Sequence, residues 1–145
     1  MPALLLATAS TMFLALLLTA SLAEPVAPSL TDQPPDATVV AVALEAASAT
    51  RGEALIVEYA CSVCHITGGG RVAPSFAGIA DRAASRRLHM SAGQYLFESI
   101  VQPGAYLVAG YANAMPSNFA KRLSQAEIGH IIAYLLTLSV PEGSS

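Results

Sequence analysis

The chain contains 145 residues, of which 54% are hydrophobic and 12% are charged, and its formal net charge at pH 7 is −3. This length accommodates one ordinary domain. The ten acidic residues outnumber the seven basic ones, and this balance supports neither nucleic-acid binding nor strong attraction to a membrane surface.

The N-terminal segment is apolar and carries no charged side chain between residues 2 and 23. Its leucine-rich runs suit the hydrophobic region of a secretory signal peptide, and the small residues Ser21 and Ala23 offer a cleavage point. An uncleaved membrane anchor is the alternative, because a helix of this length spans about 33 Å. Both interpretations predict that the rest of the chain lies in the periplasm or on the outer face of the cytoplasmic membrane.

Residues 24–49 are predicted to be an acidic linker rich in Pro and Ala. They contain four prolines and four acidic side chains without a single base, a composition that favours an extended, solvated tether. The apolar run at residues 39–44 shows neither helical nor strand periodicity. We expect this run to lie along the domain, and contact with a partner subunit is the alternative.

The first helix is predicted to begin at Thr50, because Glu53 follows three residues later in the spacing of a capping box. Apolar residues then recur at three- and four-residue spacing and give the helix one apolar face. These residues are Leu55, Ile56, Tyr59 and Val63. The helix is therefore expected to continue directly into the cysteine pair that follows.

Two cysteines three positions apart and followed at once by histidine match the motif for covalent attachment of haem c. In this interpretation Cys61 and Cys64 form thioether bonds to the haem, and His65 binds its iron. A zinc site would normally take four protein ligands, but the chain has only two cysteines, and His89 and His130 lie far along the sequence. A dithiol redox motif is expected at the start of a helix, whereas this pair follows one. We predict one covalently attached haem c.

The second helix is predicted to begin at Ser91, where Gln94 completes a capping box, and to end before Pro103. Met90 immediately precedes the cap. Its expected role is a hydrophobic staple that packs against Tyr95 in the first turns of the helix.

The third helix is predicted to begin at Ser124, with Glu127 three residues later, and to end before Pro141. Its apolar residues form a continuous stripe at helical spacing. The three helices together predict an all-α domain over residues 50–139, preceded by the extended tether and followed by a short tail at residues 140–145.

Iron held by one histidine needs a second axial ligand. The other candidates are His89, His130 and Met90, and Met90 is already assigned to the staple. Helical phase directs His130 away from the apolar stripe, so that it is expected to face water. His89 lies in a charged segment typical of a surface. Met115 lies in the loop between the second and third helices, where Pro116 prevents helix formation and fixes the direction of the chain. We therefore predict Met115 as the second axial ligand.

Five segments follow one another along the chain, at residues 61–65, 73–78, 95–103, 115–117 and 132–136. This order of segments resembles a class I (mitochondrial-type) monohaem cytochrome c of bacterial kind. The resemblance implies the small cytochrome c fold, with three main helices around one covalently bound haem. It also implies that the Pro74 backbone carbonyl accepts a hydrogen bond from the ring of His65, and that the first and last helices cross closely at Gly52 and Gly129.

The haem is expected to lie among apolar side chains, and its exposed edge is expected near the cysteine motif and the Met115 loop. The expected surrounding residues are Leu55, Phe76, Leu96, Ile100 and Leu107. At the exposed edge, a mostly apolar contact with a partner would use Ile66, Val72 and residues 112–114.

The predicted function is electron transfer by a high-potential haem with His65 and Met115 as axial ligands. The protein would be a carrier or a haem subunit in a respiratory or photosynthetic chain, between a quinol-oxidising complex and an oxidase or reaction centre. It would not be an enzyme, and it would not bind nucleic acid. The alternatives are an exported thiol-disulfide oxidoreductase that uses Cys61 and Cys64, and a haem peroxidase with an open axial position.

Overall fold

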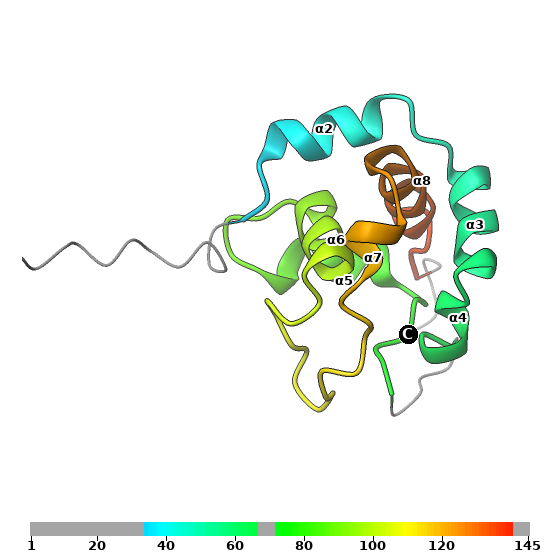
Figure 1. The fold of residues 1–145 in the computed structure, drawn as a ribbon. Coiled ribbons are helices and arrows are strands. Elements are labelled where there is room, and N and C mark those ends of the chain that lie inside the picture. Colours follow the sequence, from blue (N-terminus) through cyan, green and yellow to red (C-terminus); the bar gives the residue numbers. More distant parts are fainter. Residues whose placement is uncertain (1–33, 67–71, 141–145) are drawn as a thin grey trace, which may run out of the picture. The chain divides into compact units, whose positions relative to one another are not determined.

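The computed structural model describes residues 34–66 and 72–140, and within these ranges it contains seven helices and no strand (Figure 1). The predicted all-α fold is thus confirmed. The helices are α2 (Ala37–Glu45), α3 (Ala49–Glu58), α4 (Cys61–Cys64), α5 (Ile79–Arg86), α6 (Ala92–Val101), α7 (Phe119–Arg122) and α8 (Gln125–Leu135). None of the helices in the described ranges is both long and apolar enough to cross a membrane. The predicted signal peptide or anchor at residues 1–23 lies outside the described residues.

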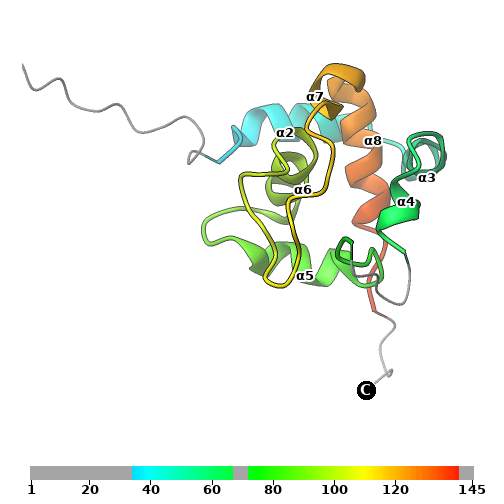
Figure 2. The ribbon, with the colours of Figure 1, turned by 60° about the horizontal axis from the view of Figure 1, so that its bottom comes forward.

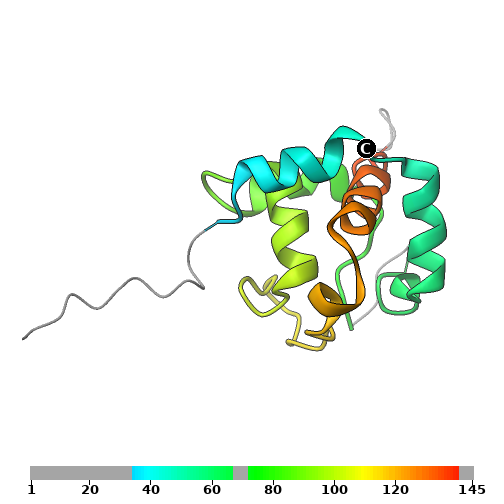
Figure 3. The same ribbon diagram turned by 45° about the horizontal axis from the view of Figure 1, so that its top comes forward.

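Helices α3 and α8 form the most extensive contact between helices in the described ranges (Figure 3). Gly52 on α3 lies directly against the backbone carbonyl of His130 on α8, so that a Cβ atom at Gly52 would overlap this carbonyl. The imidazole of His130 reinforces the crossing, because its Nδ1 accepts a hydrogen bond of 2.9 Å from the backbone N–H of Ser48. The close crossing expected at Gly52 is therefore present.

Gly129 serves a different contact from the one expected. It lies against the backbone carbonyl of Ala43 on α2, not against α3. Helix α2 packs on α8 and α6, and the side-chain amide of Gln125 donates a hydrogen bond of 2.9 Å to the Val39 carbonyl. Residues 37–45 are thus part of the folded domain, which corrects the prediction of a linker over residues 24–49.

The predicted capping boxes of α6 and α8 both form. Ser91 and Gln94, and likewise Ser124 and Glu127, exchange the two hydrogen bonds that define this motif. The predicted start of α3 was wrong by two residues, because Ser48 is the N-cap and its hydroxyl accepts from the Arg51 N–H. With Ser48 as the cap, the Gly52 N–H donates to the Ser48 carbonyl within the helix and is no longer free for a cap at Thr50.

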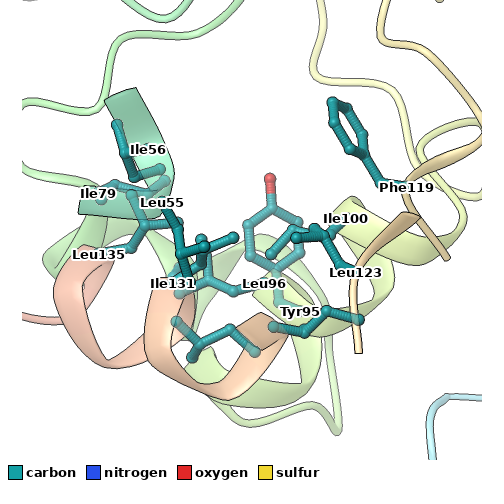
Figure 4. Packing of buried hydrophobic residues seen from close by; sticks show 13 residues of the cluster. Leu55, Ile56, Ile79, Tyr95, Leu96, Ile100, Phe119, Leu123, Ile131 and Leu135 are labelled. Carbon is teal, nitrogen blue, oxygen red and sulfur yellow. The ribbon is translucent and has the colours of Figure 1, made fainter. Parts of the chain in front are cut away.

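The hydrophobic core gathers apolar side chains from α3, α5, α6, α7 and α8 (Figure 4). Leu55 on α3 and Ile132 on α8 are completely buried where these helices meet. Met90, just before the cap of α6, and Tyr95 in its first turns are both buried. Met90 does not belong to the core cluster that contains Tyr95, so the expected hydrophobic staple stays a prediction. In Figure 4 the Tyr95 hydroxyl points into the space between Ile56 and Phe119, away from the rest of the core. This side of the core is where the candidate site lies.

Candidate cofactor site

A cavity of about 240 Å³ lies between the cysteine motif and the loop that joins α6 to α7. Figure 2 shows this loop as the yellow segment between the two helices. The walls of the cavity are mainly apolar and come from helices α3 to α8 and the irregular segments between them. Cys61, Cys64, His65 and Met115 all line it. The four side chains predicted to hold a haem therefore share one cavity.

The cysteines lie on α4, a single helical turn that is separate from α3. The chain breaks between the two helices because Ala60 adopts a left-handed conformation with φ of 55°. The expected continuous helix through the cysteine motif was therefore wrong. As a consequence, Val63 does not join the apolar face of α3, and its side chain is 75% exposed.

The two thiols differ in exposure, because Cys61 is half-buried and Cys64 is exposed. Burial raises the pKa of the Cys61 thiol, and the weaker effects of a backbone hydrogen bond and of Arg122 act in the opposite direction. A thiol oxidoreductase normally needs a cysteine with a lowered pKa. The environment of Cys61 thus opposes the thiol-redox alternative.

His65 is held from two sides. Its Nδ1 atom lies 2.7 Å from the backbone carbonyl oxygen of Pro74, and its ring stacks on Phe76 with centroids 4.5 Å apart and an interplanar angle of 3°. Burial lowers the pKa of the imidazole below its ordinary value of 6.5, while the bond to Pro74 acts in the opposite direction. When the neutral ring donates the Nδ1 proton to a carbonyl, its Nε2 atom keeps a free lone pair. A histidine needs this lone pair to bind a metal.

The segment that carries Pro74 is fixed in turn by Arg82 on α5. The guanidinium of Arg82 donates to the backbone carbonyls of Ser75 and Ala77, at 2.7 and 2.6 Å. These two carbonyls flank Phe76, the stacking partner of His65. No sequence pattern indicated this role, because Arg82 and its partners meet only through the path of the backbone before α5.

Met115 lines the cavity from the loop between α6 and α7, and its side chain is partly buried against the core. The other candidates lie elsewhere: Met90 is buried beside the first turn of α6, His89 is exposed, and neither residue lines the cavity. His130 does not line it either. It is half-buried and bonded to Ser48, which corrects the expectation that it faces water.

The apolar lining differs in part from the expected set. Phe76, Leu96, Ile100 and Leu107 do line the cavity, but the fully buried Leu55 does not, and its neighbour Ile56 takes that place. Helix periodicity assigned both residues to the apolar face and could not tell which one meets α8 and which one meets the cavity. Four tyrosines, Tyr59, Tyr95, Tyr106 and Tyr111, also line the cavity and were not expected there.

Apolar side chains are exposed beside the cavity mouth. Ile66 and Val72, which border the residues outside the described ranges, are 45% and 55% exposed. Residues 112–114, which line the cavity, are exposed as well. These residues were expected at the exposed edge of the cofactor, and their exposure leaves them accessible to a partner.

The donor set fits a haem and does not fit a bare metal ion. Within residues 34–66 and 72–140, no group of three or more His, Cys, Asp or Glu side chains comes together as a metal site. One imidazole and one thioether, lining a mainly apolar cavity beside two cysteines, instead suit an iron whose other ligands come from a porphyrin.

Comparison with known proteins agrees with this geometry. A protein-family model described as cytochrome c matches residues 49–139. Neither the search of curated proteins nor the search of solved structures gave a match. The matched region contains the cysteine motif, His65, Met115 and every helix from α3 to α8. The chain therefore belongs to the cytochrome c family, whose members carry electrons on a covalently attached haem c.

Proposed function

We propose that the protein transfers single electrons through one haem c bound to Cys61 and Cys64, with His65 and Met115 as the axial ligands. The observation that carries this proposal is that these four side chains line the same apolar cavity, while the competing residues His89, His130 and Met90 do not.

The residues of the cavity would each have a distinct task. The two cysteines anchor the cofactor, and the Pro74 carbonyl orients His65 so that Nε2 is available to the iron. Bound haem supplies a reversible one-electron change at its iron. The Met115 thioether favours the reduced state relative to a second histidine, and the apolar lining disfavours the more charged oxidised state. Both effects support a high reduction potential.

The setting of this electron transfer is part of the proposal. The apolar segment at residues 2–23 supports export to the periplasm or the outer face of the cytoplasmic membrane. There the protein would accept electrons from a quinol-oxidising complex and deliver them to an oxidase or photosynthetic reaction centre, as a carrier or as a fixed subunit. The exposed apolar side chains Ile66 and Val72 support a docking contact that depends weakly on salt.

The ligand assignment is tested on the purified holoprotein. A pyridine haemochrome spectrum should report one covalently attached haem per chain. The ferric protein should show the weak absorption near 695 nm that is expected of methionine–iron ligation.

Two matched methionine variants complete this test. Met115→Ala should abolish the 695 nm band and allow carbon monoxide to bind the ferrous protein, because both thioether bonds and His65 are untouched. Met90→Ala should keep the band, since Met90 is buried beside α6 and does not line the cavity. The reverse pattern would show that the axial assignment is wrong.

A further inference from the structure

The loop that carries Met115 has no long-range hydrogen bond to the rest of the described domain. Within the described residues, every hydrogen bond of residues 104–117 joins positions two or three apart in the chain, as between the Tyr111 N–H and the Val108 carbonyl. The loop contains no helix and no strand. Its position against α6 must therefore depend on side-chain packing.

Tyr106 is the aromatic side chain of this loop that packs on a buried neighbour. Its ring meets that of Tyr95 on α6 edge to face, with centroids 6.0 Å apart and planes inclined by 80°. The guanidinium of Arg87 covers the same ring, with its central carbon 5.7 Å from the centroid. This distance lies within the range of a cation–π contact.

Arg87 is held over the ring by a buried carboxylate. Its Nη1 donates a hydrogen bond of 2.8 Å to Oε2 of Glu98 on α6, and the Glu98 side chain is only 4% exposed. Glu98 is the one buried charged residue within the described ranges. The Coulomb attraction in such a pair is largely offset by the loss of hydration, so that a buried ion pair is weak evidence for added stability. Its specific contribution is to fix the direction of the guanidinium.

We propose that Glu98, Arg87 and Tyr106 form a latch that keeps the Met115 loop closed on the cavity and so keeps Met115 available to the iron. The inference rests on the proposed role of Met115 as the axial ligand. The latch sets how often the loop opens, because Tyr106 and Met115 belong to the same segment and both line the cavity. Arg87 and Glu98 line no part of the cavity and act as positioning residues.

The test measures exchange of the axial ligand in the ferric holoprotein by titration with imidazole. The first variant is Arg87→Met combined with Glu98→Leu, which removes the ion pair without leaving one buried charge alone. The second variant, Tyr106→Leu, removes only the aromatic ring. Each should bind imidazole on the order of tenfold more tightly than the unaltered protein. Imidazole can bind only when the loop is open, and both variants should populate the open state more.

The combination of all three substitutions gives a further readout. If the three side chains act as one unit, the triple variant should bind imidazole no more tightly than the tighter of the two simpler variants. If the fold-increase in imidazole affinity of the triple variant equals the product of the two separate fold-increases, the ion pair and Tyr106 act independently. This result would overturn the proposed latch.

A control variant separates the latch from a general loss of stability. Val40→Ala creates a cavity where α2 packs on the domain, in a part that lines no cofactor cavity. It should lower the denaturation midpoint and leave imidazole affinity unchanged. If Val40→Ala tightens imidazole binding as much as the latch variants do, the effect is a global one and the proposal is wrong.

Met115→Ala distinguishes failure of the latch from failure of the axial assignment. If this variant binds imidazole no more tightly than the unaltered protein, Met115 is not the ligand, and the proposed function fails together with the latch. If Met115→Ala binds imidazole tightly but the latch variants bind it as the unaltered protein does, the ligand assignment stands and the latch alone is overturned.

Discussion

The two walls of the cavity are built differently. On the histidine wall, His65 is held by the Pro74 carbonyl and by stacking on Phe76, and Arg82 ties the surrounding backbone in place with two hydrogen bonds. On the methionine wall, the Met115 loop makes only local hydrogen bonds within the described residues. Hydrogen bonds to the surrounding backbone fix the direction of the His65 ring, whereas a loop held by packing alone can open occasionally. We therefore expect His65 to be the permanent ligand and Met115 the exchangeable one.

The largest effect is expected when one of the two proposed covalent links to the haem is removed from the histidine wall. Cys64→Ala should abolish or greatly reduce haem incorporation, and the chain should then lose most of its helical structure. Without the haem, the apolar walls of the cavity of about 240 Å³ lose the contacts that the cofactor would make with them. A small domain has only about 5–15 kcal/mol of stability in total, so the loss of these contacts should unfold most of it.

Circular dichroism of the Cys64→Ala chain measures this outcome. Ser62→Ala, at an exposed position between the two cysteines, is the matched control and should keep both haem and fold. A well-folded apo form of Cys64→Ala would contradict the view that the cofactor completes the core.

The next largest effect concerns the helix crossing that supports the histidine wall. Gly52→Ala places a Cβ atom against the His130 carbonyl, so that α3 must move away from α8. We expect a loss of about 3 kcal/mol in the free energy of unfolding, at the upper end of the cost of overpacking, and reduced haem incorporation.

Gly129→Ala is the informative comparison for Gly52→Ala. It forces the same kind of overlap, but with Ala43 on α2, and no residue of α2 lines the cavity. We expect it to lower the denaturation midpoint without changing the haem spectrum. Equal spectral changes in both glycine variants would show that α2 supports the site as much as α3 does.

A smaller effect tests the backbone support of His65. Arg82→Met removes two hydrogen bonds from a charged donor and should lower the free energy of unfolding by about 2 kcal/mol. The 695 nm band should persist in this variant, because Met115 is untouched.

Chemical denaturation followed by haem absorbance measures the Arg82→Met effect. Arg86→Met alters the neighbouring arginine, for which the structure shows no hydrogen bond at the buried Nε, and it should cost less. Loss of the 695 nm band in Arg82→Met would mean that the two walls are coupled, contrary to the comparison drawn above.

The smallest expected effect lies outside both walls, at the start of α8. Hydrogen bonds from the Ser124 backbone and hydroxyl lower the pKa of the Glu127 carboxyl below its ordinary value of 4.5. Because the pKa is lower in the folded state, this contribution to stability is present above pH 4.5 and is lost as the pH falls through the folded-state pKa. Below pH 4.5, the free energy of unfolding of Glu127→Gln should therefore depend slightly less on pH than that of the unaltered protein. If the pH dependence in this range is the same in both proteins, this carboxylate does not contribute.

Part of this protein could be predicted from its sequence alone, because the relevant signals are local. The five-residue motif from Cys61 to His65 indicated the cytochrome c family, whose model matches residues 49–139, and the capping boxes at Ser91 and Ser124 formed as predicted. In each case the interacting groups lie within one helical turn, so the chain needs no tertiary contact to bring them together.

Tertiary packing decided the rest. The apolar run at residues 39–44 has no clear period of its own, and it becomes helical in α2, which packs on α8 through Gly129. Packing between distant segments also decides that Ile56 and not Leu55 faces the cavity, and that Arg82 and Arg87 support opposite walls. These roles depend on which surfaces meet across long stretches of sequence, and contacts of this kind leave no periodic pattern in the chain itself.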